Sequence, residues 1–259
     1  MGKVKKMKKI VKYLINKVGY DIKKIHPEEK QINFDDLLKN KVSKNPLIID
    51  VGGNKGKSIE KYLKIFDRPI IHSFEPIEAD FEYMYNKFNK NENIILNNFA
   101  LGDKIEEKNF NITINSGNSS FNQINPNTKW LKKRAKQFKT TEKNYVTSIQ
   151  KVKIKKLDDY IQNNNIDKVD LLKIDTQGYE DKVLKGAEKT IKNNKIKAIV
   201  TEIIFDNIYD KHFSFSDIEK FIVPYDFRMV GINLPVNNLF TGLVFDADVY
   251  YLNKNYYDL

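Results

Sequence analysis

A short apolar segment followed by a glycine-rich turn constrains this chain more than any other feature. Residues 47–51 read Leu-Ile-Ile-Asp-Val, and the turn 52–56 and a helical pattern from Ser58 follow them. A second apolar run, residues 70–74, leads into Glu75. Strand, glycine turn, helix, strand and acid form the layout of a nucleotide-binding βαβ unit, because glycines let the backbone approach the ligand and the second acid binds two ribose hydroxyls. The segment therefore predicts a site for an adenosine-containing cofactor.

The order of residues in the turn narrows the choice of cofactor. The turn reads Asp50-x-Gly52-x-Asn54-x-Gly56, so it matches neither the dinucleotide pattern nor the phosphate loop Gly-x-x-x-x-Gly-Lys-Ser/Thr. An acid before the first glycine would repel a pyrophosphate, whereas it would attract an ammonium group. S-adenosylmethionine carries an ammonium, a carboxylate and a sulfonium, and it has no phosphate. We therefore expect S-adenosylmethionine as the cofactor and a methyltransferase as the class of protein.

Composition bounds the domain organisation. With 259 residues, 41% of them hydrophobic, the chain is long enough for one large core. We expect an N-terminal extension over residues 1–45 and one domain over residues 46–259, with an insert at about 104–156. No apolar run approaches the ~20 residues of a membrane span. The absence of cysteine excludes disulfides, thiolate zinc sites and thiol catalysis, and it favours a cytoplasmic location.

The net charge of +11 is concentrated at the N-terminus. Residues 1–24 hold nine lysines and one acid, which leaves the rest of the chain at only +3. Apolar residues recur there at steps of three and four, as in an amphipathic helix: Val4, Met7, Val11, Leu14 and Val18. Such a helix is typical of peripheral contact with an anionic membrane or a nucleic acid. Packing on its own domain or on a second copy in a homo-oligomer is the alternative that we favour, because the stripe lacks Trp and Phe.

Alternating strand and helix patterns begin at residue 47 and continue to residue 252. Strands are expected over residues 47–51, 70–74, 94–99, 169–174, 196–203, 228–232 and 249–252. Helices are expected over residues 58–66, 78–88, 157–163, 179–191 and 216–223. This alternation predicts an α/β, doubly wound, mostly parallel seven-stranded sheet that helices cover on both faces. Residues 226–252 read as a closing β-hairpin, which would add an antiparallel edge strand.

The polar segment between Gly102 and Leu157 interrupts this rhythm. Residues 110–114 and 116–121 resemble the two arms of a hairpin, and a basic stretch follows over residues 129–143. An insertion of this length inside a compact domain usually serves as a lid or binding loop. We interpret it as a cap on the acceptor side of the site, with a solvated surface helix as the alternative for its charges.

The segment around residue 173 carries the second chemical signal. Side chains alternate along a strand, so Leu171, Lys173 and Asp175 share one face. A lysine in a strand that is covered on both sides must be paired, and Asp175 is the expected partner. Asp175 also lies at the carboxyl end of its strand, where doubly wound sheets place their ligand crevice. In the next helix Glu180 either complements the helix dipole or contacts substrate.

Methyl transfer to an alcohol oxygen benefits from a general base by roughly 10²–10⁴-fold. We rank Asp175 first for this role. Glu202 is second, because it should end the neighbouring strand and face the same crevice. His212 is third, since its ordinary pKa suits the task, although a lone histidine is more often a surface or packing residue.

Five segments share their order and spacing with a known family: residues 49–56, 74–76, 100–103, 157–160 and 173–188. They resemble the FkbM-type methyltransferases, a branch of the class I, Rossmann-like, S-adenosylmethionine-dependent enzymes, and the pair Ser119-Ser120 resembles the serine pair of that family. The resemblance implies methyl transfer to oxygen, often a hydroxyl of a sugar or a natural product. Family members commonly have Glu where Gln177 stands and Ala where Gly53 stands. The second difference is expected to be harmless.

The candidate site residues follow from the motifs and the resemblance. Cofactor contacts are expected from Asp50, Gly52, Gly53, Asn54, Lys57, Ser58, Glu75, Pro76, Asn98, Ala100, Ser119, Ser120 and Asp175. Acceptor contacts are expected from Gln177, Tyr179, Glu180, Lys132 and Arg134, and catalytic roles from Asp175, Glu202, Lys173 and His212. No metal is predicted, although four residues offer the oxygen ligands that Mg²⁺ prefers: Asp175, Glu202, Asp206 and Asn207.

The function predicted from the sequence is O-methylation of a sugar hydroxyl, on a nucleotide-activated sugar or a glycan precursor of polysaccharide biosynthesis. The basic insert would suit a diphosphate or another anionic acceptor. Methylation of RNA at the ribose 2′-oxygen is an alternative, because Lys173, Asp175 and Glu202 echo the Lys-Asp-Lys-Glu set of those enzymes. A nearly neutral body without an RNA-binding module argues against it. A non-catalytic scaffold that binds the cofactor is the third reading.

Overall fold

The computed structural model describes residues 2–20, 34–205, 207–211, 213–234 and 245–257, and the side chains of residues 2–8 are outside this description. The helices are α1 Gly2–Lys17, α2 Phe34–Lys41, α3 Lys57–Ile65, α4 Glu78–Phe88, α5 Lys129–Gln137, α6 Leu157–Asn163, α7 Glu180–Gly186, α8 Glu188–Lys192 and α9 Phe215–Glu219. The strands are β1 Leu47–Val51, β2 Ile70–Phe74, β3 Ile94–Asn97, β4 Ala100–Leu101, β5 Glu106–Thr113, β6 Val146–Lys155, β7 Val169–Ile174, β8 Ile196–Ile204, β9 Phe227–Asn233 and β10 Asp246–Asn253.

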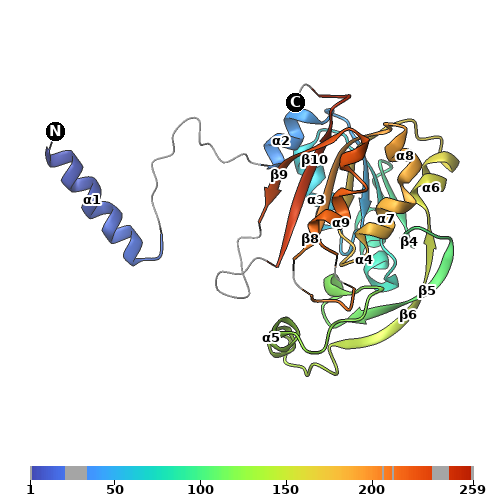
Figure 1. Cartoon of the computed structure of the whole chain (residues 1–259), viewed down its shortest axis with the longest axis horizontal. Coiled ribbons are helices and arrows are strands. Elements are labelled where there is room, and N and C mark those ends of the chain that lie inside the picture. Colours follow the sequence, from blue (N-terminus) through green and yellow to red (C-terminus); the bar gives the residue numbers. More distant parts are fainter. Residues whose placement is uncertain (1, 21–33, 206, 212, 235–244, 258–259) are drawn as a thin grey trace.

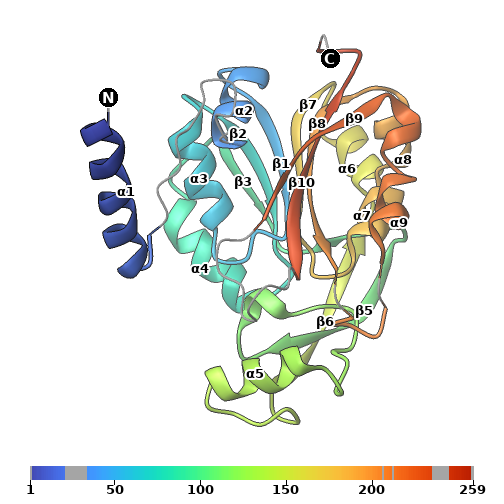
Figure 2. The ribbon, with the colours of Figure 1, turned by 60° about the vertical axis from the view of Figure 1, so that its left-hand side comes forward.

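A seven-stranded sheet in the order β3-β2-β1-β7-β8-β10-β9 forms the centre of the molecule (Figures 1 and 2). β1 pairs in parallel with β2 on one side and with β7 on the other, so the strand order reverses between β1 and β7. β10 runs antiparallel to both β8 and β9, which confirms the predicted mixed sheet and the closing hairpin. The reversal at β1 and β7 is the switch point at which open α/β sheets bind their ligands.

Helices cover both faces of this sheet, which explains its almost wholly apolar central strands. Alternate residues of β1 point to opposite faces, as strand geometry requires. Ile49 belongs to a core that includes Leu157 of α6 and Val183 of α7. Ile48, the adjacent residue, belongs to a second core, which includes Leu38, Ile59, Tyr62, Met84 and Phe88 of α2, α3 and α4. A strand with one polar face would leave one of these two helix layers without an apolar partner.

The insert forms a second, three-stranded sheet in the order β4-β6-β5. The predicted hairpin between residues 110–114 and 116–121 is wrong: β5 pairs with β6, whereas residues 116–118 form a 3₁₀ turn, and only an isolated bridge joins Asn111 to Ser120. β6 has alternating lysines and apolar residues, and it buries Val152 and Ile154 against the core of the second sheet. The hairpin prediction overlooked this longer partner, which offers more backbone hydrogen bonds than the short polar arm.

Other element boundaries differ from the predictions in smaller ways. The predicted strand over residues 94–99 ends at Asn97, and Ala100 then pairs with Ile154 of the second sheet. The predicted helix over residues 179–191 is divided into α7 and α8 after Gly186. A Cβ at Gly186 would lie 2.0 Å from the Gly102 carbonyl oxygen, so the close approach of these two segments requires glycine there.

The two N-terminal helices differ in their relation to the body. α2 lies within the predicted 1–45 extension, yet it packs on the sheet: Leu38 is 2% exposed, and the Phe34 ring stacks on Tyr250 at 4.5 Å. α1 stands apart from the body in both views (Figures 1 and 2). Within the described residues, none of the helices combines the length and apolarity that a bilayer crossing requires. The packed body thus includes residues that the sequence assigned to the extension.

Substitution of Leu38 tests this assignment. Leu38→Ala leaves a cavity under α2, and we expect the free energy of unfolding to fall by about 2–5 kcal/mol. Leu14→Ala removes the same side chain from α1, where Leu14 is 56% exposed, and it should change this free energy by less than about 0.5 kcal/mol. Chemical denaturation of both variants measures the difference. Equal, small effects would show that α2 does not belong to the core.

Candidate active site

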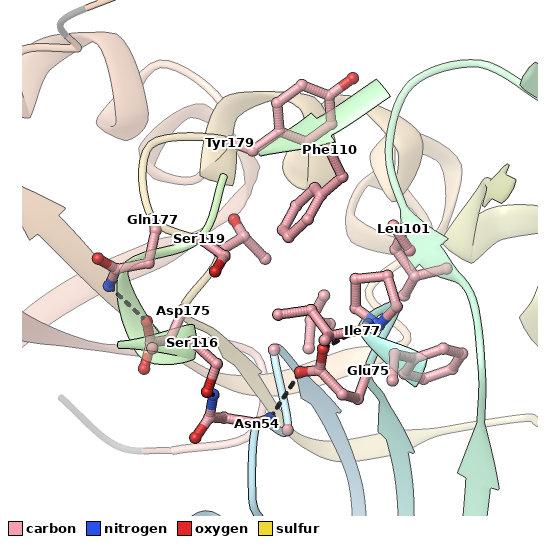
Figure 3. A pocket seen from close by; sticks show the side chains of 18 of the residues that line it. Asn54, Glu75, Ile77, Leu101, Phe110, Ser116, Ser119, Asp175, Gln177 and Tyr179 are labelled. Carbon is pink, nitrogen blue, oxygen red and sulfur yellow. Dashed lines mark hydrogen bonds between the residues drawn. The ribbon is translucent and has the colours of Figure 1, made fainter. Parts of the chain in front are cut away.

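A cavity of about 280 Å³ opens at the carboxyl ends of the central strands, between the main sheet and the insert (Figure 3). Its walls come from the glycine turn, the ends of β2 and β7, the second sheet and the segment 116–121 of the insert: Val51, Gly52, Gly53, Asn54, Lys57, Ser58, Phe74, Glu75, Pro76, Ile77, Ala100, Leu101, Phe110, Ser116, Gly117, Ser119, Phe121, Lys173, Asp175, Thr176, Gln177 and Tyr179. Asp175 and Glu75 lie on opposite sides of the cavity (Figure 3). The strand ends and the insert thus enclose one elongated site.

The glycine turn brings backbone against the ends of β2 and β7. Gly52 has a φ of +84°, and a Cβ there would lie 1.9 Å from the Asp175 carbonyl oxygen, so no other residue fits without backbone movement. The amides of Gly52 and Gly53 both donate to the Phe74 carbonyl at 3.0 Å. A Cβ at Gly53 would lie 2.3 Å from Ser73 Oγ. The alanine that family members commonly have at this position would therefore disturb, in this chain, the Ser73 hydroxyl that bonds to Asp50.

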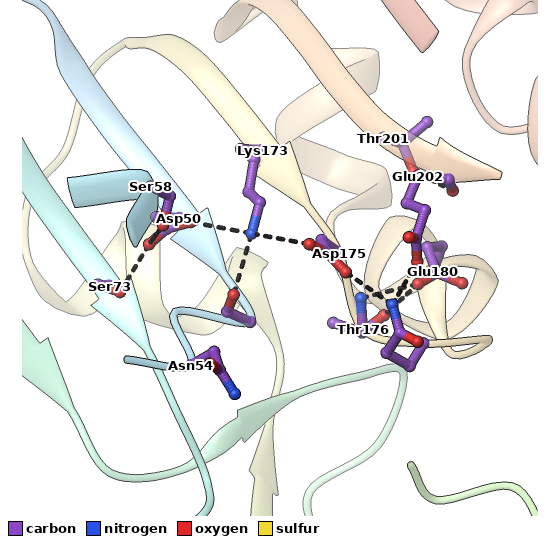
Figure 4. Close-up of polar contacts among 12 residues, drawn as sticks. Asp50, Asn54, Ser58, Ser73, Lys173, Asp175, Thr176, Glu180, Thr201 and Glu202 are labelled. Carbon is purple, nitrogen blue, oxygen red and sulfur yellow. Dashed lines mark hydrogen bonds and ion pairs between the residues drawn. The ribbon is translucent and has the colours of Figure 1, made fainter. Parts of the chain in front are cut away.

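Lys173, on β7, contacts the end of β1, the glycine turn and the residue that follows β7 (Figure 4). Its Nζ donates to the Gly52 carbonyl at 2.9 Å and lies 3.3 Å from Asp50 Oδ1 and 3.5 Å from Asp175 Oδ2. The predicted pairing of Lys173 with Asp175 is confirmed, and Asp50 is a second partner. Burial acts to lower the pKa of Lys173, but the charges of Asp50 and Asp175 outweigh it and raise the pKa, so the ammonium persists at neutral pH.

Asp50 lies beneath the turn and does not line the cavity. The residue is 0% exposed, and its Oδ2 accepts hydrogen bonds from Ser58 and Ser73, each at 2.8 Å. Its Oδ1 faces Lys173. Oδ1 accepts no hydrogen bond among the described residues, but the side chain is buried and does not line the cavity, so the contact between Asp50 and the ammonium of the cofactor stays a prediction. The visible effect of Asp50 is to hold the start of α3, the end of β2 and Lys173 together.

Glu75 is held in place by two backbone amides. Its Oε2 accepts from Asn54 N and its Oε1 from Ile77 N, both at 2.7 Å. The residue is only 4% exposed, and burial raises the pKa of the carboxyl to about 8 despite these two hydrogen bonds. A carboxyl with this pKa is neutral in much of the population at pH 7. A ligand that donates hydroxyls to it would favour the charged form.

Gln177 links the two predicted catalytic carboxylates on the other side of the cavity. Its Nε2 donates to Asp175 Oδ1 at 3.1 Å and to Glu202 Oε2 at 2.6 Å, and its Oε1 accepts from Tyr209 Oη at 3.1 Å. The backbone at Gln177 adopts a φ of +55°, and its carbonyl accepts from Ser120 Oγ at 2.7 Å. Every polar atom of the amide group is thus engaged, and a donor separates two acids that would otherwise repel each other.

Glu202 belongs to a group of buried acids whose charges raise one another's pKa values. Burial and the charges of Asp175 and Glu180 raise the pKa of Glu202 well above its ordinary value. Asp246 and Asp248 enter from β10, and Asp248 stands opposite Glu202 in the register. Burial, followed by the charge of Asp175, raises the pKa of both aspartates. Asp175 lines the cavity and Glu202 does not, so this geometry favours Asp175 over Glu202 as a base.

The turn between β7 and α7 is held together from within. Glu180 is 3% exposed, and its carboxylate accepts from the amides of Thr176 and Gly178 at 2.8 and 3.0 Å. Burial raises the pKa of Glu180 to about 7. Of its two predicted roles, the structural one is visible here: the side chain faces the turn and does not line the large cavity. Tyr179, the residue before it, does line the cavity.

Comparison with known proteins assigns the family. Residues 50–229 match the Methyltransferase FkbM domain. This chain belongs to the FkbM methyltransferase family. It is therefore an S-adenosylmethionine-dependent methyltransferase, which confirms the resemblance seen in the sequence and the expected cofactor.

Two groups of relatives add detail. The 2-O-methyltransferase NoeI of Sinorhizobium fredii (strain NBRC 101917 / NGR234) is 20% identical over 166 residues, which span 64% of this chain and 66% of that protein. The rRNA methylase from Streptococcus thermophilus has a TM-score of 0.46 at 10% identity, over 85% of this chain and 93% of that one. Magnesium protoporphyrin IX methyltransferase (ChlM) from Synechocystis PCC 6803 has a TM-score of 0.44 at 10% identity, over 95% and 96%. These structural likenesses are too weak to bear on the substrate.

The donor set of the cavity suits the cofactor of the FkbM family. The acid beneath the glycine turn is Asp50, whose charge would repel a phosphate at this place. A ligand without phosphate avoids that repulsion. Glu75 offers a carboxylate on one side and Asp175 offers one on the other. Among the described residues, no group of three or more acids and histidines has the arrangement of a metal site. The remaining metal candidate Asp206 lies outside the described residues.

Not all predicted site residues of this FkbM methyltransferase line the cavity. Ten of the thirteen predicted cofactor contacts line the cavity, whereas Asp50, Asn98 and Ser120 do not. Asn98 Nδ2 donates to the Glu75 carbonyl at 3.0 Å. Lys132 is exposed on α5, and the Arg134 guanidinium lies 5.6 Å from the centre of the Trp130 ring. His212 lies outside the described residues.

Sequence reasoning missed the apolar half of the cavity. Ile77, Leu101, Phe110 and Phe121 line it, and all four are buried. Ile77 follows the Glu-Pro pair directly, so proximity in sequence alone was a usable signal. Phe110 lies on β5 of the second sheet, and Phe121 follows the isolated bridge at Ser120 and packs on the Phe110 ring, an arrangement that the sequence did not reveal.

The pKa of Glu75 predicts a pH-dependent affinity for ligands that carry a ribose. Below about pH 8 the free carboxyl is mostly protonated, and binding through its charged form must release a proton. The affinity should therefore rise with pH and level off above about 8. Calorimetry with 5′-methylthioadenosine in buffers of different ionisation enthalpy measures the proton release, because this ligand has no amino acid group to titrate. Glu75→Gln should bind more weakly and show a flat pH profile; an unchanged profile would contradict the role of Glu75.

The bridge made by Gln177 predicts a pH-dependent loss of stability in Gln177→Glu. The introduced carboxyl would lie between two acids, so its pKa in the folded state would rise above its unfolded value. The variant should match the wild type below the unfolded pKa of roughly 4.3 and lose about 1–3 kcal/mol as the pH rises toward neutrality. Thermal denaturation across this range measures the loss. Gln162→Glu, on the exposed end of α6, is the matched control and should show no such slope.

Proposed function

We propose that this protein transfers a methyl group to a hydroxyl oxygen of a sugar, on a nucleotide-activated sugar or a glycan precursor. The observation that carries the proposal is the placement of Asp175. Its side chain is 40% exposed, it lines the cavity, and Lys173 and Gln177 fix its two oxygens. An alcohol acceptor needs a base of this kind, whereas an amine or a thiolate does not.

The comparisons support the oxygen acceptor. The relative named NoeI is a 2-O-methyltransferase, and this chain spans slightly less than two-thirds of its length. Family members typically methylate hydroxyls of sugars or natural products, as the resemblance in the sequence implies. The sugar remains our proposal, and so does the cytoplasmic location inferred from the absence of cysteine.

The cavity suggests how the cofactor lies. We assign the two ribose hydroxyls to Glu75 and the adenine to the apolar wall formed by Ile77, Leu101 and Phe110. The amino acid end then lies near the glycine turn and Asp175. In this arrangement Asp50 acts indirectly, by holding Lys173 and the turn, and not by touching the ligand. Lys57 and Ser58, at the start of α3, also line the cavity and would lie beside the amino acid end.

The bound cofactor supplies an electrophilic methyl group on its sulfonium. The chain must bring the acceptor hydroxyl into line with that methyl and receive its proton. As the new O–C bond forms and the S–C bond breaks, the hydroxyl proton passes to Asp175. Lys173 and Gln177 hold the carboxylate so that a free lone pair faces the cavity. Ser119, Phe121 and Tyr179 of the far wall would contact the acceptor ring.

Asp175→Asn should separate chemistry from binding. The amide keeps the shape and one hydrogen bond but accepts no proton, so turnover should fall by roughly 10²–10⁴-fold while the affinity for S-adenosylhomocysteine stays within about tenfold. Single-turnover methyl transfer and calorimetry measure the two quantities. Asp67→Asn makes the same change in the loop before β2, away from the cavity, and should leave both unchanged. Full turnover in Asp175→Asn would move the base to another residue.

The acceptor class is tested by methyl incorporation from labelled cofactor into nucleotide sugars, glycan extracts and total RNA. Label in a sugar fraction, lost in Asp175→Asn, is the expected result. Label confined to RNA, with a steep dependence on salt, would replace the proposal by ribose methylation. Tight binding of S-adenosylhomocysteine without transfer to any fraction would favour the scaffold.

A further inference from the structure

The helix α1 presents an apolar stripe that the rest of the chain does not cover. Ile10, Val11, Leu14 and Val18 are 53%, 46%, 56% and 70% exposed. At 100° per residue Ile10, Val11 and Leu14 fall within about 100° around the helix axis, and Val18 follows them in the turn directly after α1, so the four residues form one strip. α1 also lies outside the residues that match the methyltransferase family. Neither the fold nor the proposed reaction accounts for this strip.

The remaining surface of the same helix is strongly cationic. The 16 residues of α1 include seven lysines and no acidic residue. Lys9 and Lys12 lie opposite the strip, and Lys17 lies at its border, with its Nζ 5.2 Å from the centre of the Tyr13 ring. An apolar strip bordered by lysines is the pattern of a helix that lies in the plane of a membrane surface.

Of the possible occupants, only an anionic lipid surface satisfies both faces. A nucleic acid would neutralise the lysines but leave the apolar strip in water, since phosphate contacts bury little apolar area. A second α1 would cover the strip but bring two helices of seven lysines each together. The body carries little net charge and leaves the strip exposed in this structure. A headgroup layer accepts the lysine charges while its acyl region accepts the strip.

We propose that α1 docks this methyltransferase on membranes rich in anionic lipid. This goes beyond the proposed reaction and does not depend on it. It revises the reading favoured from the sequence, in which the helix packs on its own domain or on another copy. Docking would bring the cavity close to acceptors that are built or carried at a membrane surface, and it would leave the catalytic domain in water.

Binding of the full-length protein to vesicles tests the proposal. We expect co-sedimentation with vesicles of about 30 mol% phosphatidylglycerol in phosphatidylcholine, and at least roughly tenfold weaker binding to phosphatidylcholine alone or at high salt. Val11→Gln and Leu14→Gln remove apolar groups from the strip with a residue that favours helix at least as well as valine does, and each should weaken binding by roughly tenfold. Lys9→Glu should weaken it less and reduce the dependence on salt.

The matched control is Ile105→Gln, which removes a side chain that is 71% exposed on the catalytic domain. It should bind vesicles as the wild type does. All variants should keep the melting temperature and the affinity for S-adenosylhomocysteine, so a failure of the proposed reaction would be seen separately. Wild-type binding in Val11→Gln and Leu14→Gln, equal binding to neutral vesicles, or self-association through α1 in sedimentation velocity would each overturn the proposal. Binding to an RNA oligonucleotide but not to anionic vesicles would also overturn it.

Discussion

The buried ammonium of Lys173 is the interaction on which the arrangement of this site depends. It joins the end of β1, through Asp50 and the Gly52 carbonyl, to the end of β7, through Asp175. A charge in this position is costly unless it is paired, and here two acids outweigh the cost of burial. The same contacts bend the glycine turn over β7 and orient the proposed base. Fold and chemistry therefore share one ion pair at the switch point of the sheet.

The sequence revealed this part of the molecule well because its signals are local. A strand, a glycine turn and an acid two residues from a lysine are all read within a few positions, and strand alternation places them on one face. β1, β2 and β7 accordingly have the boundaries that the apolar runs predict. The burial of Asp50 was not visible, because it depends on Ser58 and Ser73, which approach from other elements.

The insert contains the features that patterns of neighbouring residues did not predict. β5 pairs with β6 across more than 30 residues, and the sequence offers a shorter partner that imitates a hairpin. Pairing over such a separation is decided by which strand buries more apolar surface, here Val152 and Ile154 against Phe110 and Phe121. The aromatic wall of the cavity follows from that pairing. The part of the site at the strand ends is thus predicted by local motifs, whereas the part formed by the insert depends on packing between distant segments.

The hydrogen bonds of Gln177 require the insert and the turn between β7 and α7 to move little relative to each other. Ser120 of the cap donates to the Gln177 carbonyl, and Asn122 Nδ2 donates to the neighbouring Gly178 carbonyl, so the insert is tied to the turn that carries the bridge. If that turn shifted, the amide would lose Asp175 or Glu202, and the acids would be left facing each other without a donor. Ser120 of the cap therefore helps to keep the amide of Gln177 between the two acids, although Ser120 does not line the cavity.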